Sequence, residues 1–130
     1  MKCLVVEDEF TSRLMLQKLL EKYGEVHIAA NGKEAAEAVH LALNEDAPYD
    51  LITMDVMMPE MNGQEALKSI RDIETTFEIL PAQGAKIIMT TSLGDGKSIM
   101  SAFKDQCDGY LVKPLETKKL FKYLESFELI

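Results

Sequence analysis

The chain has 130 residues, of which 47% are hydrophobic, and its formal net charge is −8. This length suits one domain, residues 1–130, with a single core. The 14 basic residues are scattered, which argues against a nucleic-acid binder, because phosphate backbones are held by clusters of Lys and Arg. No stretch has the length of a signal peptide or a membrane span, so we expect no membrane association and a cytoplasmic location.

Short apolar runs alternate along the chain with longer stretches of helical period. The predicted strands are Lys2–Val6, Glu25–Ala29, Leu51–Met54, Ala85–Thr90 and Gly109–Val112. Apolar residues at helical spacing predict five helices between and after them. The helices are indicated by Leu16, Leu19, Leu20 and Tyr23; by Ala35, Val39 and Ala42; by Gly63, Ala66, Leu67 and Ile70; by Ile99, Ala102 and Phe103; and by Leu120, Leu124 and Phe127. The stretch Asp72–Gly84 is interpreted as a surface loop.

Strands that alternate with helices predict a parallel sheet with right-handed crossovers. Five strands in a chain of this size suit an α/β fold with a doubly wound, five-stranded parallel sheet of order 2-1-3-4-5, flanked by five helices. In that order the first and third strands are neighbours. Their carboxyl ends then form the switch point at which such sheets bind ligands.

Carboxylates follow both of these neighbouring strands. Glu7 and Asp8 come directly after the first strand, and Asp55 comes directly after Met54. Three such groups at close range cannot all stay ionised without a compensating cation. Oxygen ligands are typical of hard divalent ions, and magnesium usually takes one or two carboxylates together with phosphate oxygens. The sequence therefore predicts a magnesium site that handles a phosphoryl group.

The cysteines and histidines show no site pattern. Cys3 and Cys107 match no metal or redox spacing and are interpreted as buried small hydrophobic residues. His27 and His40 have no His, Cys or carboxylate partner at ligand spacing and are interpreted as structural.

Four short motifs stand in order at the ends of the first, third, fourth and fifth strands. They are Val5-Val6-Glu7-Asp8, Met54-Asp55-Val56-Met57-Met58-Pro59, Thr90-Thr91-Ser92 and Val112-Lys113-Pro114. Each motif is weak alone, but together they extend over essentially the whole chain, which resembles the receiver domain of two-component response regulators, similar to single-domain chemotaxis-type regulators. The resemblance implies a flavodoxin-like receiver fold with the same strand order.

The resemblance further implies that Asp55 accepts a phosphoryl group from a phosphohistidine on a sensor histidine kinase or a histidine phosphotransfer protein. A carboxylate is a competent nucleophile for this transfer, which needs mainly positioning and charge neutralisation. The resemblance then makes Asp8 a direct magnesium ligand and Glu7 a ligand through water. Asp55 and the Met57 carbonyl are the remaining protein ligands. Most relatives have Asp where this chain has Glu7, and the longer side chain still reaches a metal-bound water. Such a protein is no enzyme toward other substrates; it catalyses only its own phosphoryl transfer and dephosphorylation.

Three further residues take roles from the resemblance. Lys113 meets a phosphoryl oxygen and holds Asp55 before transfer, although an isolated Lys beside Pro is otherwise a solvated side chain; the family's Lys–Pro bond is commonly cis. Thr91 supplies the hydroxyl that hydrogen-bonds the phosphoryl group, and strand alternation also favours it over Thr90. Tyr110 is the aromatic residue that changes rotamer on activation, with core packing as the alternative interpretation of a Tyr in a strand.

Two apolar positions bear on the lifetime of the phosphorylated state. In the family, the residues two after the nucleophile and two after the switch hydroxyl flank the path of the attacking water; here they are Met57 and Leu93. Neither side chain orients a water by hydrogen bonding. We therefore expect slower hydrolysis than in relatives with Asn and Glu there.

The signal is expected to leave through a protein partner, because no output domain follows Ile130. The resemblance implies a partner-binding face made of Ser98–Gln106, the fifth strand and Glu116–Phe127, which a phosphoryl group shifts between two states, in a monomer or a weak phosphorylation-dependent dimer. This face carries several basic side chains that either meet an acidic partner or form an ordinary solvated surface. They are Lys104, Lys118, Lys119 and Lys122.

Other functions fit the sequence less well. Gly94–Ser98 is similar to the end of a phosphate-binding loop, but the first glycine of that motif is replaced by Thr91. A phosphatase of the haloacid-dehalogenase type needs a second Asp two residues after the nucleophile, where Met57 stands. The main alternative is a receiver-fold interaction module that is not phosphorylated, whose signature is loss of an acidic residue or of the Lys; both are present.

Overall fold

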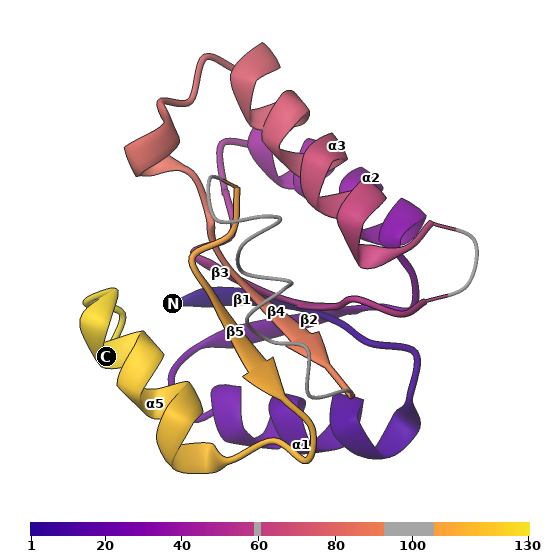
Figure 1. Cartoon of the computed structure of the whole chain (residues 1–130). Helices are drawn as coiled ribbons and strands as arrows, with labels where there is room; N and C mark the ends of the chain where they lie inside the picture. The colour runs from indigo at the N-terminus through magenta and orange to yellow at the C-terminus, as the bar shows by residue number, and fades with distance from the viewer. Residues whose placement is uncertain (59–60, 93–105) are drawn as a thin grey trace.

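A computed structural model describes residues 1–58, 61–92 and 106–130 (Figure 1). The strands are β1 (Lys2–Val6), β2 (Glu25–Ala29), β3 (Leu51–Asp55), β4 (Lys86–Thr91) and β5 (Gly109–Val112). The helices are α1 (Phe10–Leu20), α2 (Gly32–Asn44), α3 (Gly63–Thr76), α5 (Thr117–Ser126) and the 3₁₀ helix η1 (Pro81–Gln83). The fourth predicted helix falls within residues 93–105, outside the described residues. The described part of the chain contains four α-helices, where the sequence predicted five for the whole chain.

The five strands form one parallel sheet of order β2-β1-β3-β4-β5, which confirms the predicted order. Val6, the last residue of β1, pairs with Ala29 of β2 and with Met54 of β3. Asp55 pairs with Thr90 of β4. The register therefore brings the carboxyl ends of β1, β3 and β4 to one level at the same edge of the sheet.

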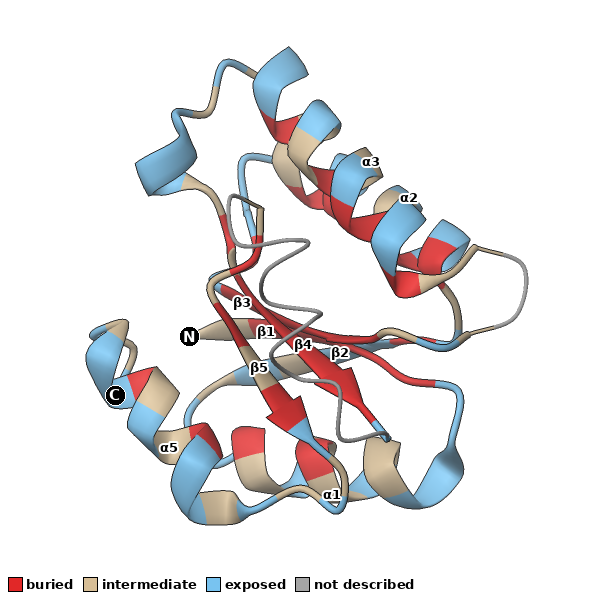
Figure 2. Cartoon of the chain, in the orientation of Figure 1, coloured by how far each residue is buried: buried red, intermediate tan, exposed pale blue. Residues whose placement is uncertain are grey.

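Helices cover both faces of the sheet: α2 and α3 lie on one face and α1 and α5 on the other (Figure 1). Successive strand residues point to opposite faces, so Leu4, Ile52 and Ile87 pack with α2 and α3, whereas Cys3 and Leu51 pack with α1 and α5. The central strands are buried on both sides (Figure 2), as their continuous apolar runs predict. Among the described residues, no helix is long and apolar enough to cross a membrane.

Two helices on the same face begin with the same capping pattern. The Asn31 side chain accepts a hydrogen bond of 2.9 Å from the Glu34 main-chain nitrogen, and the Asn62 side chain accepts one of 3.0 Å from Glu65. An N-cap residue of this type satisfies one of the main-chain donors that the first turn leaves unpaired. Asn62 therefore fixes where α3 begins, directly after the turn that follows β3.

The predicted surface loop over Asp72–Gly84 is wrong in its first part. Helix α3 continues to Thr76, and η1 occupies three of the remaining residues. Pro81 and Gly84 near the end of this stretch favoured the loop interpretation, and a charged residue on the buried side of α3 concealed the end of the helix. Glu74 is buried, and its Oε2 accepts a hydrogen bond of 2.7 Å from the Ala85 nitrogen. The bounds of two strands also differ slightly, since β3 includes Asp55 and β4 runs from Lys86 to Thr91.

The cysteines and histidines occupy structural positions. Cys3 and Cys107 are both buried, as predicted. His27 Nδ1 lies 2.7 Å from the Tyr49 hydroxyl, and the His40 ring packs edge-on against Phe77 with 5.4 Å between ring centroids. These contacts agree with structural roles for both histidines.

A pair of matched substitutions tests the packing of the helices. Leu67→Ala, at a fully buried position of α3, is expected to lower the free energy of unfolding by about 2–5 kcal/mol, since it removes buried methyl groups and leaves a cavity. Leu41→Ala in α2 is the control, because 56% of Leu41 is exposed and its loss is expected to cost roughly 1 kcal/mol or less. Urea unfolding measures both, and equal losses would contradict the described core.

Candidate functional site

The sheet brings the three predicted carboxyl groups together at one edge. Glu7 follows β1 and is 1% exposed, Asp55 ends β3 and is 5% exposed, and Asp8 is exposed to solvent. One carboxylate oxygen from each residue lies within 4.8 Å of the others. Because Val6 and Met54 are register partners, the residues that follow them are delivered side by side.

The lysine ammonium group that the resemblance predicts beside Asp55 lies at the site. Lys113 follows β5 directly, and its Nζ lies 2.7 Å from Glu7 Oε1 and 3.5 Å from Asp55 Oδ2. Its side chain is 14% exposed, so the three charges interact in a partly desolvated pocket where water screens them poorly. The sequence pointed to contact with Asp55; it did not show that Glu7 holds the ammonium group at the shorter distance.

Main-chain donors complete the contacts of the two buried carboxyl groups. The Met57 nitrogen donates a hydrogen bond of 3.2 Å to Asp55 Oδ1, and the Glu9 nitrogen donates one of 3.2 Å to Glu7 Oε2. Both donors lie two residues after the acceptor, in the turns that leave β3 and β1. The turns thus orient each carboxyl group, in addition to ending the strands.

The surroundings of Asp55 disfavour its charged form. Burial is the main cause, followed by a hydrogen bond with Glu7 and the charge of Glu7; together they raise the pKa of Asp55 from 3.8 to about 7, although Lys113 and the Met57 N–H act in the opposite direction. For Lys113, burial lowers the pKa, but the hydrogen bond to Glu7 and the carboxylate charges outweigh burial, so that its pKa is raised above 10.5. The side chains of the site by themselves therefore carry more negative charge than the Lys113 ammonium group balances.

The turn after Asp55 packs closely against the start of α3. The Gly63 nitrogen donates a hydrogen bond of 3.0 Å to the Val56 carbonyl. A Cβ atom at Gly63 would lie 2.5 Å from the Asp55 carbonyl oxygen and 2.8 Å from the Val56 Cα, closer than main-chain atoms permit. Glycine at this position therefore lets α3 approach the site, a role that the helical periodicity of the sequence did not indicate.

The other predicted site residues lie on the neighbouring strands. Thr90 and Thr91 end β4 and are both buried, and the Thr91 carbonyl accepts a hydrogen bond of 2.6 Å from the Lys113 nitrogen. Ile87 and Met89 share the core cluster against α2 and α3, so alternation assigns Thr91 to that face, as predicted. The role of the Thr91 hydroxyl stays a prediction.

Tyr110 lies in the middle of β5 and is partly buried, in contact with the core cluster that packs against α2 and α3. This contact agrees with the packing interpretation, and the switching role of Tyr110 stays a prediction. The Lys113–Pro114 peptide bond is cis, as the family resemblance implies.

The donor set fits a hard divalent cation. Glu7, Asp8 and Asp55 offer only oxygen atoms, and their three carboxyl groups outnumber the one ammonium group, that of Lys113, which the described residues bring to the site. Oxygen ligands of this kind, with room for water on the exposed side of Asp8, match the preference of magnesium. The Met57 carbonyl stays a predicted ligand.

Of the two residues predicted to flank the attacking water, Met57 is among the described residues and Leu93 is not. Met57 is 67% exposed, beside the buried Asp55. Leu93 and the phosphate-loop-like stretch Gly94–Ser98 lie outside the described residues. The Met57 side chain is thus open to solvent two residues after Asp55, and its role beside an attacking water stays a prediction.

A surface pocket of about 380 Å³ lies beside β5 and α5. Tyr110, Lys119 and Lys122 are among the residues that line it. Lys118 lies on the same helix, whereas Lys104 and most of the predicted segment Ser98–Gln106 lie outside the described residues. The described part of the predicted partner-binding face is therefore both hollowed and basic.

The comparisons with known proteins agree with the fold and the site. The response regulator receiver domain family matches residues 3–125. The chain therefore belongs to this family, the receiver domains of two-component systems.

Similar proteins include chemotaxis regulators. The chemotaxis protein CheY of Thermotoga maritima is 31% identical over 127 residues, which are 96% of this chain and 95% of that protein. CheY of Bacillus subtilis is 31% identical over 125 residues, with the same coverage. Among solved structures, the receiver domain of the histidine kinase CKI1 from Arabidopsis thaliana, complexed with Mg²⁺ and BeF₃⁻, has a TM-score of 0.82 and 30% identity, covering 98% of this chain and 89% of that chain.

The raised pKa of Asp55 predicts how stability depends on pH. Because the folded value of about 7 lies above the ordinary value of 3.8, the folded state binds this proton more tightly, and Asp55 lowers stability progressively as pH rises from about 4 to about 7. In metal-free buffer, Asp55→Asn is therefore expected to become more stable than wild type across this window, by on the order of 1–3 kcal/mol at its upper end. Urea unfolding at several pH values measures the difference; a constant difference would contradict the assignment.

Proposed function

We propose that the protein is a phosphoacceptor receiver that takes a phosphoryl group onto Asp55 from a phosphohistidine of a sensor histidine kinase or a histidine phosphotransfer protein. The observation that carries this proposal is the joint placement of Asp55, two further carboxyl groups and Lys113 at one edge of the sheet. Family membership supports it. A single carboxylate beside Lys113 could be a structural ion pair; the three carboxyl groups together with Lys113 favour a phosphoryl-transfer site.

In the transfer step, an Asp55 oxygen attacks phosphorus, the bond between phosphorus and the donor's imidazole nitrogen breaks, and the imidazole leaves with the electron pair and takes up a proton. The product is an acyl phosphate on Asp55. Lys113, 3.5 Å from Asp55 Oδ2, neutralises charge on a phosphoryl oxygen as it develops. Deprotonated Asp55 is the nucleophile, so the surroundings that raise its pKa also restrain the reaction until a cation is bound.

Magnesium is the proposed cofactor, held by Asp8, Asp55 and the Met57 carbonyl directly and by Glu7 through water. When bound, it neutralises charge on the phosphoryl oxygens, the main contribution that metals make to such transfers. The similar CKI1 receiver, solved with Mg²⁺ and BeF₃⁻, supports this proposal. Thr91 is proposed to donate its hydroxyl hydrogen bond to the transferred group.

The proposed output is a change in a protein-binding face. Phosphorylation biases the face formed by residues 98–106, β5 and Glu116–Phe127, with Tyr110 as the reporter of the change. The basic residues Lys119 and Lys122 beside the pocket favour an acidic downstream protein. On this proposal the protein acts in the cytoplasm, as a monomer or a weak phosphorylation-dependent dimer, and catalyses only its own phosphorylation and dephosphorylation.

Intact mass tests the acceptor. After incubation with magnesium and acetyl phosphate, wild type is expected to gain one phosphoryl group and Asp55→Asn none, because the amide is no nucleophile. Asp50→Asn is the matched control: Asp50 contacts Lys2 at the opposite edge of the sheet, so its variant is expected to be modified like wild type.

Two results would contradict the proposed function. Modification of Asp55→Asn to the same extent as wild type would place the phosphoryl group elsewhere. No modification of wild type, together with no magnesium binding in a titration followed by calorimetry, would favour a receiver-fold interaction module that is not phosphorylated.

The exposed Met57 predicts a long-lived phosphorylated state. Met57→Asn adds an amide that can hydrogen-bond the attacking water, so the phosphoryl group is expected to be lost about two- to tenfold faster than from wild type. This is a smaller effect than the roughly 10²–10⁴-fold of a positioned acid or base, because the amide orients the water without taking its proton. Decay of the phosphorylated mass after removal of acetyl phosphate measures the rate. Met57→Leu, which adds no polar atom, is the control; equal or slower decay in Met57→Asn would refute the prediction.

A further inference from the structure

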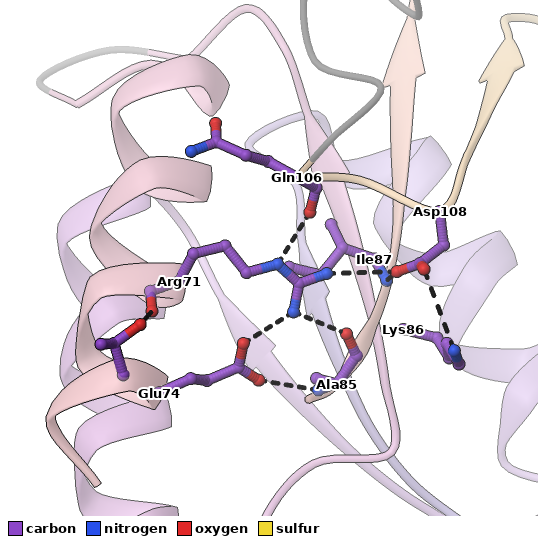
Figure 3. Close-up of polar contacts among 8 residues, drawn as sticks. Arg71, Glu74, Ala85, Lys86, Ile87, Gln106 and Asp108 are labelled. Atoms are coloured by element: carbon purple, nitrogen blue, oxygen red, sulfur yellow. Dashed lines mark hydrogen bonds and ion pairs between the residues drawn. The ribbon is translucent and has the colours of Figure 1, made fainter. Parts of the chain in front are cut away.

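A partly buried polar cluster is centred on the Arg71 side chain of α3 (Figure 3). It lies beside the residues that begin β4 and β5, at the edge of the sheet opposite the carboxyl site. Arg71 Nε donates a hydrogen bond of 2.7 Å to the Gln106 carbonyl. One terminal nitrogen donates to Glu74 Oε1 at 2.7 Å and to the Ala85 carbonyl at 2.9 Å, and the other donates to Asp108 Oδ2 at 3.1 Å. The guanidinium group thus connects α3 with the residues that precede β4 and β5.

Asp108 attaches the start of β5 to β4 at two points. Its main-chain nitrogen donates a hydrogen bond of 2.8 Å to the Ile87 carbonyl, and its Oδ2 accepts one of 2.9 Å from the Ile87 nitrogen. Asp108 therefore pairs with both the N–H and the C=O of Ile87 in β4. This double contact favours one register for β5, which starts at the next residue. Arg71 and, at 4.0 Å, Lys86 balance the charge of Asp108, which favours the charged carboxylate in this partly buried position.

Register matters at β5 because the strand is short and carries a site residue at its end. Only four residues, Gly109–Val112, separate Asp108 from Lys113. At the far end, the Lys113 nitrogen donates to the Thr91 carbonyl at 2.6 Å. A shift of one residue moves a strand by about 3.3 Å and turns its side chains to the other face, which would take the Lys113 ammonium group away from Asp55.

We propose that Arg71 and Asp108 are positioning residues for phosphoryl transfer: they fix the register of β5 on β4 from the opposite edge of the sheet and thereby aim Lys113 at Asp55. This inference rests on the proposed function for its kinetic consequence. Its structural consequence, the placement of Lys113, holds whether or not the protein is phosphorylated.

The test removes the contacts in graded steps. Arg71→Met removes all four hydrogen bonds of the guanidinium group. Asp108→Leu removes the side-chain hydrogen bond with the Ile87 nitrogen, whereas Asp108→Asn keeps an oxygen that accepts it. With magnesium and acetyl phosphate, the maximum rate of Asp55 phosphorylation is expected to fall about tenfold or more in the first two variants, because misplacement of a catalytic group by about 1 Å has effects of this size. Asp108→Asn is expected to retain at least about one third of the wild-type rate.

A stability-matched control separates positioning from general destabilisation. Val39→Ala lies in the buried face of α2, away from β5, and its rate is expected to stay within about twofold of wild type. Hydrogen exchange of the Lys113 amide supplies a second measurement on unphosphorylated protein. Its protection is expected to fall in Arg71→Met and Asp108→Leu more than in Val39→Ala. Should Arg71→Met fail to fold, the two Asp108 variants carry the comparison.

The outcomes are distinguishable. A rate in Arg71→Met and Asp108→Leu equal to that of Val39→Ala, or unchanged protection of the Lys113 amide in them, would overturn the positioning role. Absence of phosphorylation in wild type would instead refute the proposed function; loss of Lys113 protection in the two variants would then still support control of register by Arg71 and Asp108.

Discussion

The crowding of three carboxyl groups around one ammonium group is the constraint on which the carboxyl edge of the sheet depends. Burial leaves the Asp55 carboxyl with little water, which raises its pKa to about 7, and Lys113 compensates only part of the local charge. A site with this imbalance favours a divalent cation. Under the proposed function, a phosphoryl group on Asp55 would add further negative charge, so phosphoryl transfer would depend on cation binding at this edge.

The four groups come from three different strands, so their distances depend on strand register more than on local conformation. Glu7 and Asp55 follow register partners in β1 and β3. Lys113 follows β5, which among the described strands pairs with β4 alone. The pairing of strands therefore constrains the position of Lys113 less than the positions of Glu7 and Asp55. The hydrogen bonds between Asp108 and Ile87 at the start of β5, and between Lys113 and Thr91 at its end, supply the missing constraint.

The sequence predicts most of the fold because the buried strands are continuous apolar runs with few alternatives. The carboxyl cluster was equally predictable, since parallel topology places the residues after β1 and β3 together. What was missed depends on polar side chains that turn inward. Glu74 and Arg71 resemble solvated helix residues in sequence, and their partners Ala85 and Asp108 lie far along the chain, so no local pattern reveals them. The Asn62 cap, by contrast, has a local signature, because a capping Asn followed three residues later by Glu is typical of a helix start.

The placement of Tyr110 between the two ends of β5 bears on how a change at the site reaches the surface. Its main-chain nitrogen donates a hydrogen bond of 3.2 Å to the Tyr123 hydroxyl of α5, and the Tyr123 ring packs so closely on Gly109 that a Cβ atom there would lie 2.4 Å from Cε1. A displacement of β5 therefore cannot leave α5 unaffected. Because the start of β5 is held by Asp108 while its end carries Lys113, movement at the site is expected to pivot about the start of the strand. The displacement is then larger toward Val112, where the strand borders the basic pocket.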